Sequence, residues 1–126
     1  MLLNDYLNTI QNILDNTMFL LINHSLTIDK RPQQQAHISG ILIFTDESSL
    51  HFREFIDASE GWIEKVAYSY HFQDKFNHLL FRYDNAKHKP ELGFNEHKHY
   101  SNNIVYAPAP TLKQIIEEIL LTRQLV

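Results

Sequence analysis

The sequence predicts an α+β fold in which a four-stranded antiparallel β-meander is packed against an N-terminal and a C-terminal helix. Three observations support this prediction. Apolar residues recur at helical spacing near both ends of the chain, they alternate with polar residues through its middle, and only short turns separate the alternating segments. At 126 residues the chain is long enough to bury roughly two thirds of its unfolded surface. We therefore expect one domain covering residues 1–126.

The composition excludes several classes of function. The chain has no cysteine, which excludes disulfides, thiolate metal sites and cysteine nucleophiles. Its net charge is −4 with neutral histidines, so we do not expect a general polyanion binder, and any contact with nucleic acid must come from a local patch. The N-terminus lacks the features of a signal peptide, and no apolar run is long enough to span a membrane. We expect a cytoplasmic protein with no membrane partner.

The first element is a predicted helix over roughly residues 2–22. Its apolar stripe consists of Leu3, Leu7, Ile10, Leu14, Met18 and Leu21. Further apolar residues widen the stripe, and we favour a broad core face over a second face that binds a partner. Residues 26–35 are polar and contain Pro32, which predicts a loop.

Alternating segments follow this loop. We predict four strands, at residues 37–45, 50–57, 62–72 and 76–85. Their short connections are typical of an antiparallel meander. Alternation in the third strand places Val66 and Tyr68 on one face and Lys65 on the other.

Residues 86–110 lose this periodicity and contain several prolines, so we predict a long loop. Loops of this length are usually functional or disordered, and three aromatic residues favour an ordered loop packed on the domain. Thr111 and Gln114 then match a capping box, and an apolar face continues to near the end of the chain. This pattern predicts the second helix.

Histidines are concentrated between Tyr68 and Tyr100. Five of the chain's eight lie there, namely His71, His78, His88, His97 and His99. Imidazoles titrate near neutral pH and can transfer protons. In an extended backbone His97 and His99 point to one side and Lys98 to the other, whereas in a turn all three could surround one pocket. Either arrangement can bind a phosphate.

Metal-independent cleavage of RNA needs a base near the ribose 2′-hydroxyl, an acid for the leaving oxygen and a cation for the charge of the phosphorane. The residues that could supply these groups are His97, Lys98, His99 and Arg82. Four tyrosines could stack on bases: Tyr68, Tyr70, Tyr83 and Tyr100.

Simpler explanations compete with this chemistry. Histidines on strands are more often structural than catalytic, which covers His37, His51, His71 and His78. Arg82 and Asp84 lie two positions apart on one strand face, where most such pairs are exposed ion pairs. Asp84 and Asn85 could equally cap a turn. The sharper interpretation is that Asp84 orients a histidine while Arg82 holds a phosphate.

A metal site is another alternative. A His-x-His pair on an extended segment can place two nitrogens on one cation, with His88 or Glu91 as a third ligand. No second spacing supports such a site, and the helical His-Glu-x-x-His pattern is absent. We therefore predict neither a metal nor a cofactor.

One segment resembles a known family. The segment Phe81-Arg82-Tyr83-Asp84-Asn85-Ala86-x-His88-x-Pro90-Glu91-Leu92, followed by Phe94 and the triplet His97-Lys98-His99, is similar to the TumE family of prokaryotic toxin–antitoxin proteins. The resemblance extends over roughly residues 40–120. One departure is Gly93-Phe94-Asn95-Glu96, where similar proteins are expected to have a proline and another histidine, so the resemblance does not define the geometry of this loop.

The resemblance implies a single-domain toxin with a separately encoded antitoxin, commonly a helix-turn-helix DNA-binding protein. The family's His-Lys-His and Arg-Tyr-Asp-Asn positions correspond here to His97, Lys98, His99, Arg82, Tyr83, Asp84 and Asn85. Together with the chemistry above, this gives His97, Lys98, His99, Arg82 and Asp84 as the predicted catalytic residues. The predicted substrate-binding residues are Tyr68, Tyr70, Tyr83, Asn85, His88 and Tyr100.

We therefore predict the toxin component of a type II toxin–antitoxin system that inhibits growth by metal-independent RNA cleavage. The alternative is a non-catalytic module whose histidine loop docks a protein partner or a nucleotide. RNA is the expected substrate and a helix-turn-helix antitoxin the expected partner, and a homodimer is left open. The predicted arrangement is also similar to RelE-like RNA-cleaving toxins, an analogy at the level of the fold alone.

Overall fold

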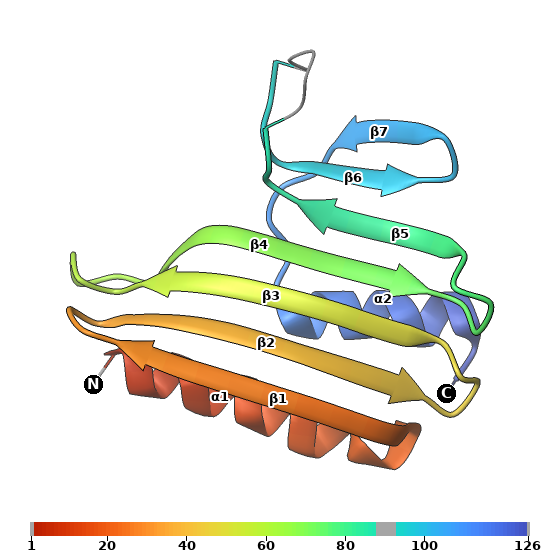
Figure 1. Cartoon of the computed structure of the whole chain (residues 1–126), viewed down its shortest axis with the longest axis horizontal. Coiled ribbons are helices and arrows are strands. Elements are labelled where there is room, and N and C mark those ends of the chain that lie inside the picture. Colours follow the sequence, from red (N-terminus) through yellow and green to blue (C-terminus); the bar gives the residue numbers. More distant parts are fainter. Residues whose placement is uncertain (1, 88–92, 126) are drawn as a thin grey trace.

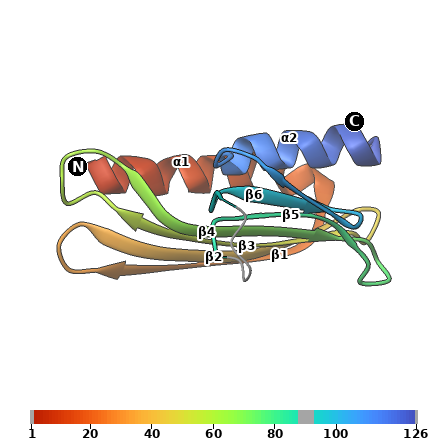
Figure 2. The same ribbon diagram turned by 90° about the horizontal axis from the view of Figure 1, so that it is seen from above.

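The computed structural model describes residues 2–87 and 93–125. Seven antiparallel strands form one sheet in the order of the chain, and both helices lie on the same side of it (Figure 1 and Figure 2). The opposite side carries no helix among these residues, and we call it the open face. The predicted α+β class with a helix from each end on the sheet is confirmed. The predicted number of four strands was wrong.

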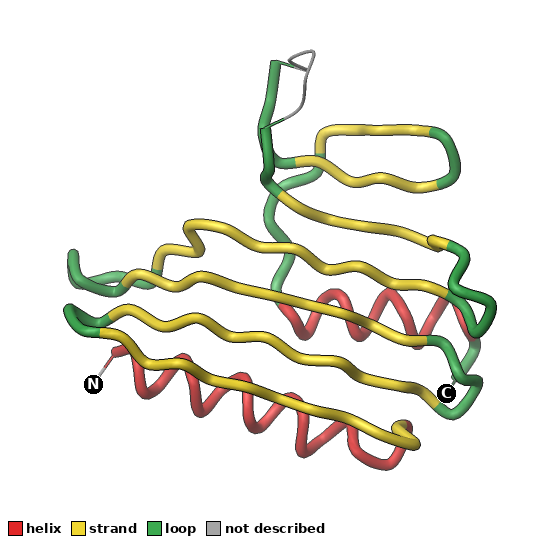
Figure 3. The backbone as a smooth tube through the Cα atoms, viewed as in Figure 1, coloured by secondary structure: helices red, strands yellow, loops and turns green. Residues whose placement is uncertain are grey.

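The helices and strands follow a simple up-and-down order, which Figure 3 shows without crossovers. They are α1 (Leu2–Thr17), the 3-10 turn η1 (Met18–Leu20), β1 (Leu21–Arg31), β2 (Gln35–Phe44), β3 (Ser49–Asp57), β4 (Glu64–Gln73), β5 (Leu79–Asp84), β6 (His97–Tyr100), β7 (Asn103–Tyr106) and α2 (Leu112–Arg123). Each strand pairs with the next, so residues close in sequence also build neighbouring strands.

β1 lies where the sequence predicted the end of a helix followed by a loop. The helix stops at Thr17, and η1 leads directly into the strand. β1 is an edge strand with mostly exposed residues, so its polar composition is that of a loop. Its turn to β2 has φ of 64° at Gln33 and 59° at Gln34, and glutamine is not the residue type that signals such a hairpin turn.

β6 and β7 form a hairpin inside the segment predicted to be one long loop. Each strand has four residues, and pairing with β5 carries β6 into the sheet. The triplet His97-Lys98-His99 therefore lies on a strand and not on a loop. Strands this short show too few alternations for a periodicity to be recognised.

A β-bulge corrects one predicted side-chain orientation. The register between β3 and β4 shifts after Phe55, where Val66 is the extra residue of β4. Because of the bulge Val66 is exposed, whereas Lys65 points toward the helices. The prediction that Val66 shares a face with Tyr68 was therefore wrong.

The core lies between the helices and the facing side of the sheet. α1 contributes the predicted stripe of Leu3, Leu7, Ile10 and Leu14. The strands contribute alternate residues of β2, β3 and β4, among them Ile38, Leu42, Phe44, Leu50, Phe52, Ile56, Tyr70 and Phe72. Gly40 leaves room for one of these rings, because a Cβ atom there would lie 2.5 Å from Cε1 of Phe52.

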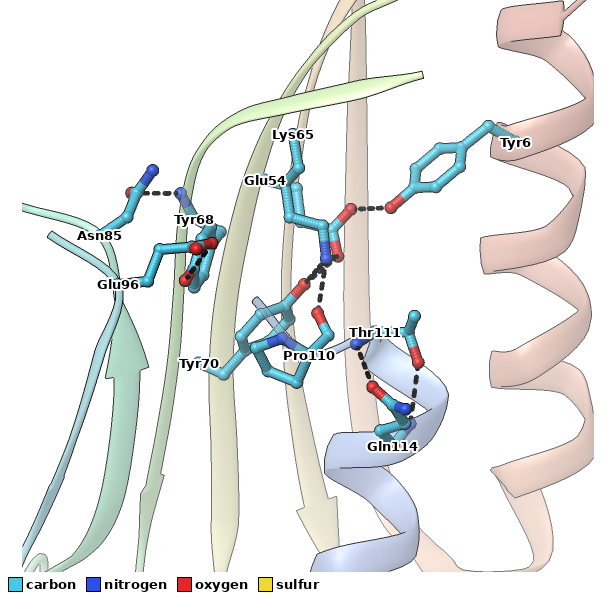
Figure 4. Close-up of polar contacts among 10 residues, drawn as sticks. All are labelled: Tyr6, Glu54, Lys65, Tyr68, Tyr70, Asn85, Glu96, Pro110, Thr111 and Gln114. Atoms are coloured by element: carbon cyan, nitrogen blue, oxygen red, sulfur yellow. Dashed lines mark hydrogen bonds and ion pairs between the residues drawn. The ribbon is translucent and has the colours of Figure 1, made fainter. Parts of the chain in front are cut away.

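A buried carboxylate joins both helices to the sheet (Figure 4). Glu54 of β3 is fully buried and accepts hydrogen bonds from the hydroxyls of Tyr6 and Tyr70. The ammonium group of Lys65 lies 3.5 Å from the same carboxylate and donates to the carbonyl of Pro110, 2.7 Å away, just before α2. Burial lowers the pKa of Lys65, and burial together with the Glu54 charge raises the pKa of both tyrosines.

The predicted capping box at α2 is confirmed. The Thr111 side chain accepts from the Gln114 amide at 3.1 Å, and the Gln114 side chain accepts from the Thr111 amide at 3.0 Å (Figure 4). In the part of the chain that the structure describes, neither helix is long and apolar enough to cross a membrane.

Candidate functional site

Two adjacent rows of mostly polar side chains cross the open face. Directly paired residues of neighbouring strands share a face and have Cβ atoms about 5 Å apart. The first row, which we call the aspartate row, is Thr27, Ser39, Arg53, Ser69, Asp84, His97 and Tyr106. The second, the histidine row, is Ser25, Ile41, His51, His71, Arg82, His99 and Ile104.

The register brings together most of the residues that the sequence predicted to be catalytic. Arg82 pairs with His99, and Asp84 pairs with His97, so all four lie side by side on β5 and β6. Lys98 lies on the other face, as expected for an extended backbone. The structure thus separates the triplet into two histidines on the open face and one lysine on the helix side.

Asp84 connects the two rows. It is 4% exposed and accepts hydrogen bonds from Arg82 Nε at 2.9 Å and from the Ala86 amide at 3.0 Å. Its carboxylate also lies 3.0 Å from Nε2 of His97 and 3.8 Å from Nε2 of His99. The predicted role of Asp84 in orienting a histidine is consistent with this geometry.

His97 is fully buried within this group. Its Nδ1 lies 2.5 Å from the backbone carbonyl of Asn95, and its Nε2 faces Asp84. Both ring nitrogens of His97 therefore face oxygen acceptors. His99 is partly exposed, with 23% of its side chain accessible, so it is the histidine of β6 that a ligand on the open face can reach.

His71 and Arg82 form a second contact across the rows. Arg82 Nη1 lies 3.3 Å from Nδ1 of His71, and Nε2 of His71 lies 3.1 Å from Oε1 of Gln73. A guanidinium only donates, so Nδ1 accepts and the proton of the neutral ring is on Nε2. Partial burial lowers the pKa of His71, and the charges of Arg82 and His51 lower it further, whereas the Gln73 hydrogen bond opposes the shift. A neutral imidazole at neutral pH can accept a proton.

Lys98 belongs to the helix side of the sheet. Its ammonium group lies 2.9 Å from Oε2 of Glu118 on α2, and the Tyr83 hydroxyl donates to Oε1 of the same residue at 2.6 Å. Burial acts to lower the pKa of Lys98, but the hydrogen bonds to Glu118 and Tyr83 outweigh it and raise the pKa. This pair connects β5 and β6 to α2, and it does not line the open face.

The predicted substrate-binding residues are also divided. Tyr68 and Tyr70 are 4% and 0% exposed and pack in the core. Asn85 ties the end of β5 to β4. Its side chain accepts a hydrogen bond from the Tyr68 amide (Figure 4) and also donates one to the Val66 carbonyl. Tyr100 on β6 is 39% exposed, and His88 lies outside the described residues.

Two shallow cavities lie on the open face. The larger, which we call the histidine cavity, has a volume of about 590 Å³. Its polar lining is Ser25, Thr27, Ser39, His51, Arg53, Ser69, His71, Gln73 and Arg82. The second, the Phe55 cavity, has about 350 Å³ and shares Arg53, Ser69 and Arg82 with the first. No aspartate or glutamate is among the described residues that line the histidine cavity, although the whole chain has a net charge of −4.

Sequence reasoning missed Arg53, His51 and His71 as site residues. The two histidines were assigned to the scaffold, because one histidine on a strand carries no functional signal. The signal that could have found them is their placement by alternation on the same face as Arg82 in three consecutive strands.

One group of residues has metal-binding potential. The ligand atoms of Asp84, His97 and His99 all lie within 4.8 Å of one another. Imidazole and carboxylate groups are ligands for transition metals. The alternative third ligands considered from the sequence, His88 and Glu91, lie outside the described residues. The absence of a metal and of a cofactor stays a prediction.

Comparison with known protein families shows which family the chain belongs to. The family model described as toxin TumE matches residues 10–124. The chain belongs to the TumE toxin family. The match confirms the resemblance found in the sequence and extends it into α1. No curated protein and no solved structure matched the chain.

Membership of the TumE family identifies the chain as a toxin component. A toxin of a toxin–antitoxin system implies an antitoxin partner.

Proposed function

We propose that this TumE-family toxin cleaves RNA without a metal ion, using the open face of its sheet. One observation carries the proposal: His71, Arg82 and His99 are paired side by side on β4, β5 and β6. Two imidazoles on either side of a guanidinium supply a base, an acid and a cation for one phosphate.

The reaction follows from these three groups. His71, whose pKa is lowered, is the base; its Nδ1, which accepts from Arg82 in the free protein, takes the proton from a ribose 2′-hydroxyl. The 2′-oxygen attacks the adjacent phosphorus, and the bond to the 5′-oxygen of the next nucleotide breaks. His99, whose Nε2 lies 3.8 Å from the Asp84 carboxylate, donates a proton to that leaving oxygen. Arg82 stabilises the additional negative charge on the phosphorane.

The remaining residues of the predicted set act indirectly. His97 is fully buried between Asp84 and Asn95, so we assign it to positioning the Asp84 carboxylate. Lys98 holds β6 to α2 through Glu118. Of the two predicted cations, Arg82 is therefore the one assigned to the phosphate, because it pairs with His99 on the open face.

The test is cleavage of RNA by the purified toxin in a buffer containing a chelator. The His71→Ala and His99→Ala variants should each lower the rate by about 10²- to 10⁴-fold, the usual contribution of general acid–base catalysis. His78→Ala is the matched control, because its side chain is 76% exposed and lies in neither cavity. A double variant that folds and cleaves at the wild-type rate contradicts the proposal. So does cleavage that the chelator abolishes and a metal restores, since Asp84, His97 and His99 would then act as metal ligands.

A non-catalytic nucleotide-binding role is the second candidate. The observation that favours it is the lining of the histidine cavity, whose cations and hydroxyls suit binding without cleavage. RNA that binds the wild-type protein but stays intact, while expression arrests growth, would support this candidate.

The partner we propose is a helix-turn-helix antitoxin that meets the toxin in the prokaryotic cytoplasm. Its support is the TumE family assignment together with the exposed apolar residues of β7, Ile104, Val105 and Tyr106. Co-expression with the product of the neighbouring gene should yield one complex on size-exclusion chromatography. Light scattering of the free toxin would show whether it forms a homodimer.

A further inference from the structure

We infer that the histidine cavity and the Phe55 cavity are two nucleotide subsites on either side of one phosphate, which Arg53 and Arg82 hold. The inference rests on the proposed function and specifies which parts of the RNA each cavity takes. Arg53, Ser69 and Arg82 line both cavities, so the boundary between them carries two guanidinium groups and a hydroxyl.

Of the two arginines at this boundary, Arg53 is the one available to a ligand among the residues that the structure describes. It is exposed, and no described residue accepts a hydrogen bond from its guanidinium or forms an ion pair with it. Its neighbours in the aspartate row are Ser39 and Ser69. Arg82, by comparison, already donates to Asp84 at 2.9 Å. A phosphate at the boundary would meet one uncommitted guanidinium, whose planar donors match phosphate oxygens.

The Phe55 cavity has the lining of a base-binding subsite. Phe55, Val66 and Ala67 supply an apolar surface, and His37 adds a polar group beside it. The Arg31 guanidinium already lies 5.8 Å from the centroid of the Phe55 ring, so this ring accepts a flat, polar partner. A nucleobase has the same requirement, because bases stack on aromatic side chains through their flat faces.

The histidine cavity has a different lining. Ser25, Thr27 and Ser39 offer hydroxyl groups, and His51 pairs directly with His71. In this cavity Phe52 and Ile41 are the apolar residues, and Phe52 is 1% exposed. Hydroxyls and imidazoles suit a ribose and its phosphate more than a stacked base. We therefore propose that the Phe55 cavity discriminates between bases. The histidine cavity contacts ribose and phosphate, so it tolerates any base.

His71 lies next to the boundary between the two cavities, as cleavage of a phosphate bound there requires. His71 contacts Arg82 at 3.3 Å, so a phosphate held by Arg82 lies beside the proposed base. The two nucleotides joined by the cleaved phosphate therefore occupy one cavity each.

The experiment measures binding of a 2′-deoxy dinucleotide monophosphate, which has no 2′-hydroxyl and cannot be cleaved by the proposed route. Calorimetry should show about ten-fold weaker binding for Phe55→Ala, because each stacked base contributes substantially to affinity. Arg53→Ala should weaken binding by a similar factor and reduce its salt dependence. The matched controls are Phe76→Ala and Lys75→Ala, since Phe76 is 68% exposed and neither residue lines a cavity.

The outcomes separate the inference from the proposed function. Wild-type affinity in both Phe55→Ala and Arg53→Ala overturns the subsites, whatever the RNA cleavage assay shows. Weakened binding in these variants, with controls unchanged, supports the subsites even where His71→Ala and His99→Ala leave cleavage unaffected. With RNA as substrate, Phe55→Ala should also reduce the preference for the base on its side.

Discussion

Replacing Asp84 with asparagine tests the arrangement on which the open face depends. The carboxylate accepts hydrogen bonds from Arg82 Nε and the Ala86 amide, and it lies 3.0 Å from Nε2 of His97. Asparagine keeps the shape but removes the charge, and it offers one oxygen where the carboxylate had two. At least one of these donors then faces an NH₂ group.

The expected loss in the free energy of unfolding is large because Asp84 and His97 are buried. Hydrogen bonds to a charged group contribute about 1.5–3 kcal/mol each, and an uncompensated buried charge costs about 3–5 kcal/mol. Asp84 is 4% exposed and His97 fully buried, so relaxation toward water is limited. We expect Asp84→Asn to lower the free energy of unfolding by about 3 kcal/mol. RNA cleavage should fall as well, because Arg82 and His99 lose their common partner.

Urea unfolding followed by circular dichroism measures the effect. The control is Asp29→Asn, whose ion pair with Arg31 is mostly exposed and should contribute less than about 1 kcal/mol. An Asp84→Asn variant as stable as the Asp29→Asn variant, with unchanged cleavage, would refute the reasoning.

Three further predictions concern the fold and its pH dependence. The pKa of His71 lies below its ordinary value of 6.5, so below that pH the unfolded chain binds more protons than the folded chain. The free energy of unfolding should therefore fall on acidification. His71→Gln should make this fall shallower, as measured by urea unfolding at several pH values. Tyr70→Phe removes a donor to buried Glu54 and should lower the free energy of unfolding by about 1–3 kcal/mol, measured in the same way. Gly40→Ala should lower the melting temperature, because the new Cβ would lie 2.5 Å from Phe52. An unchanged value in any of these measurements contradicts the corresponding contact.

The sequence predicted those elements whose pattern is long enough to be regular. The stripe of α1, the alternation of β2, β3 and β5, and the capping box at Thr111 all have a local physical cause, so they could be recognised without tertiary information. Both helices were therefore expected on the sheet.

The elements that were missed depend on tertiary contacts. β1 is an exposed edge strand with a loop-like composition, and β6 and β7 have four residues each. Their pairing partners stabilise them as strands, and no local pattern indicates which partner a short segment will find. The bulge at Val66 likewise arises from the pairing of β3 and β4.

Part of the candidate site could be placed from the sequence, but its extent was missed. Arg82, Asp84, His97 and His99 were expected together from their motif, and the register of β5 with β6 brings them together. Arg53 and His71 lie on strands that precede the motif, so their contribution depends on a register that the sequence alone did not define.

The measurement that tests the central claim most directly is the chemistry of the RNA ends produced by the purified toxin in chelator. Attack by a 2′-hydroxyl, aided by His71, Arg82 and His99, leaves a 2′,3′-cyclic phosphate or the 3′-phosphate formed from it, and a 5′-hydroxyl on the other fragment. We predict these ends from the wild-type protein and their loss in the His71→Ala, His99→Ala double variant. Fragments with a 3′-hydroxyl and a 5′-phosphate, or wild-type cleavage by the folded double variant, would contradict the account.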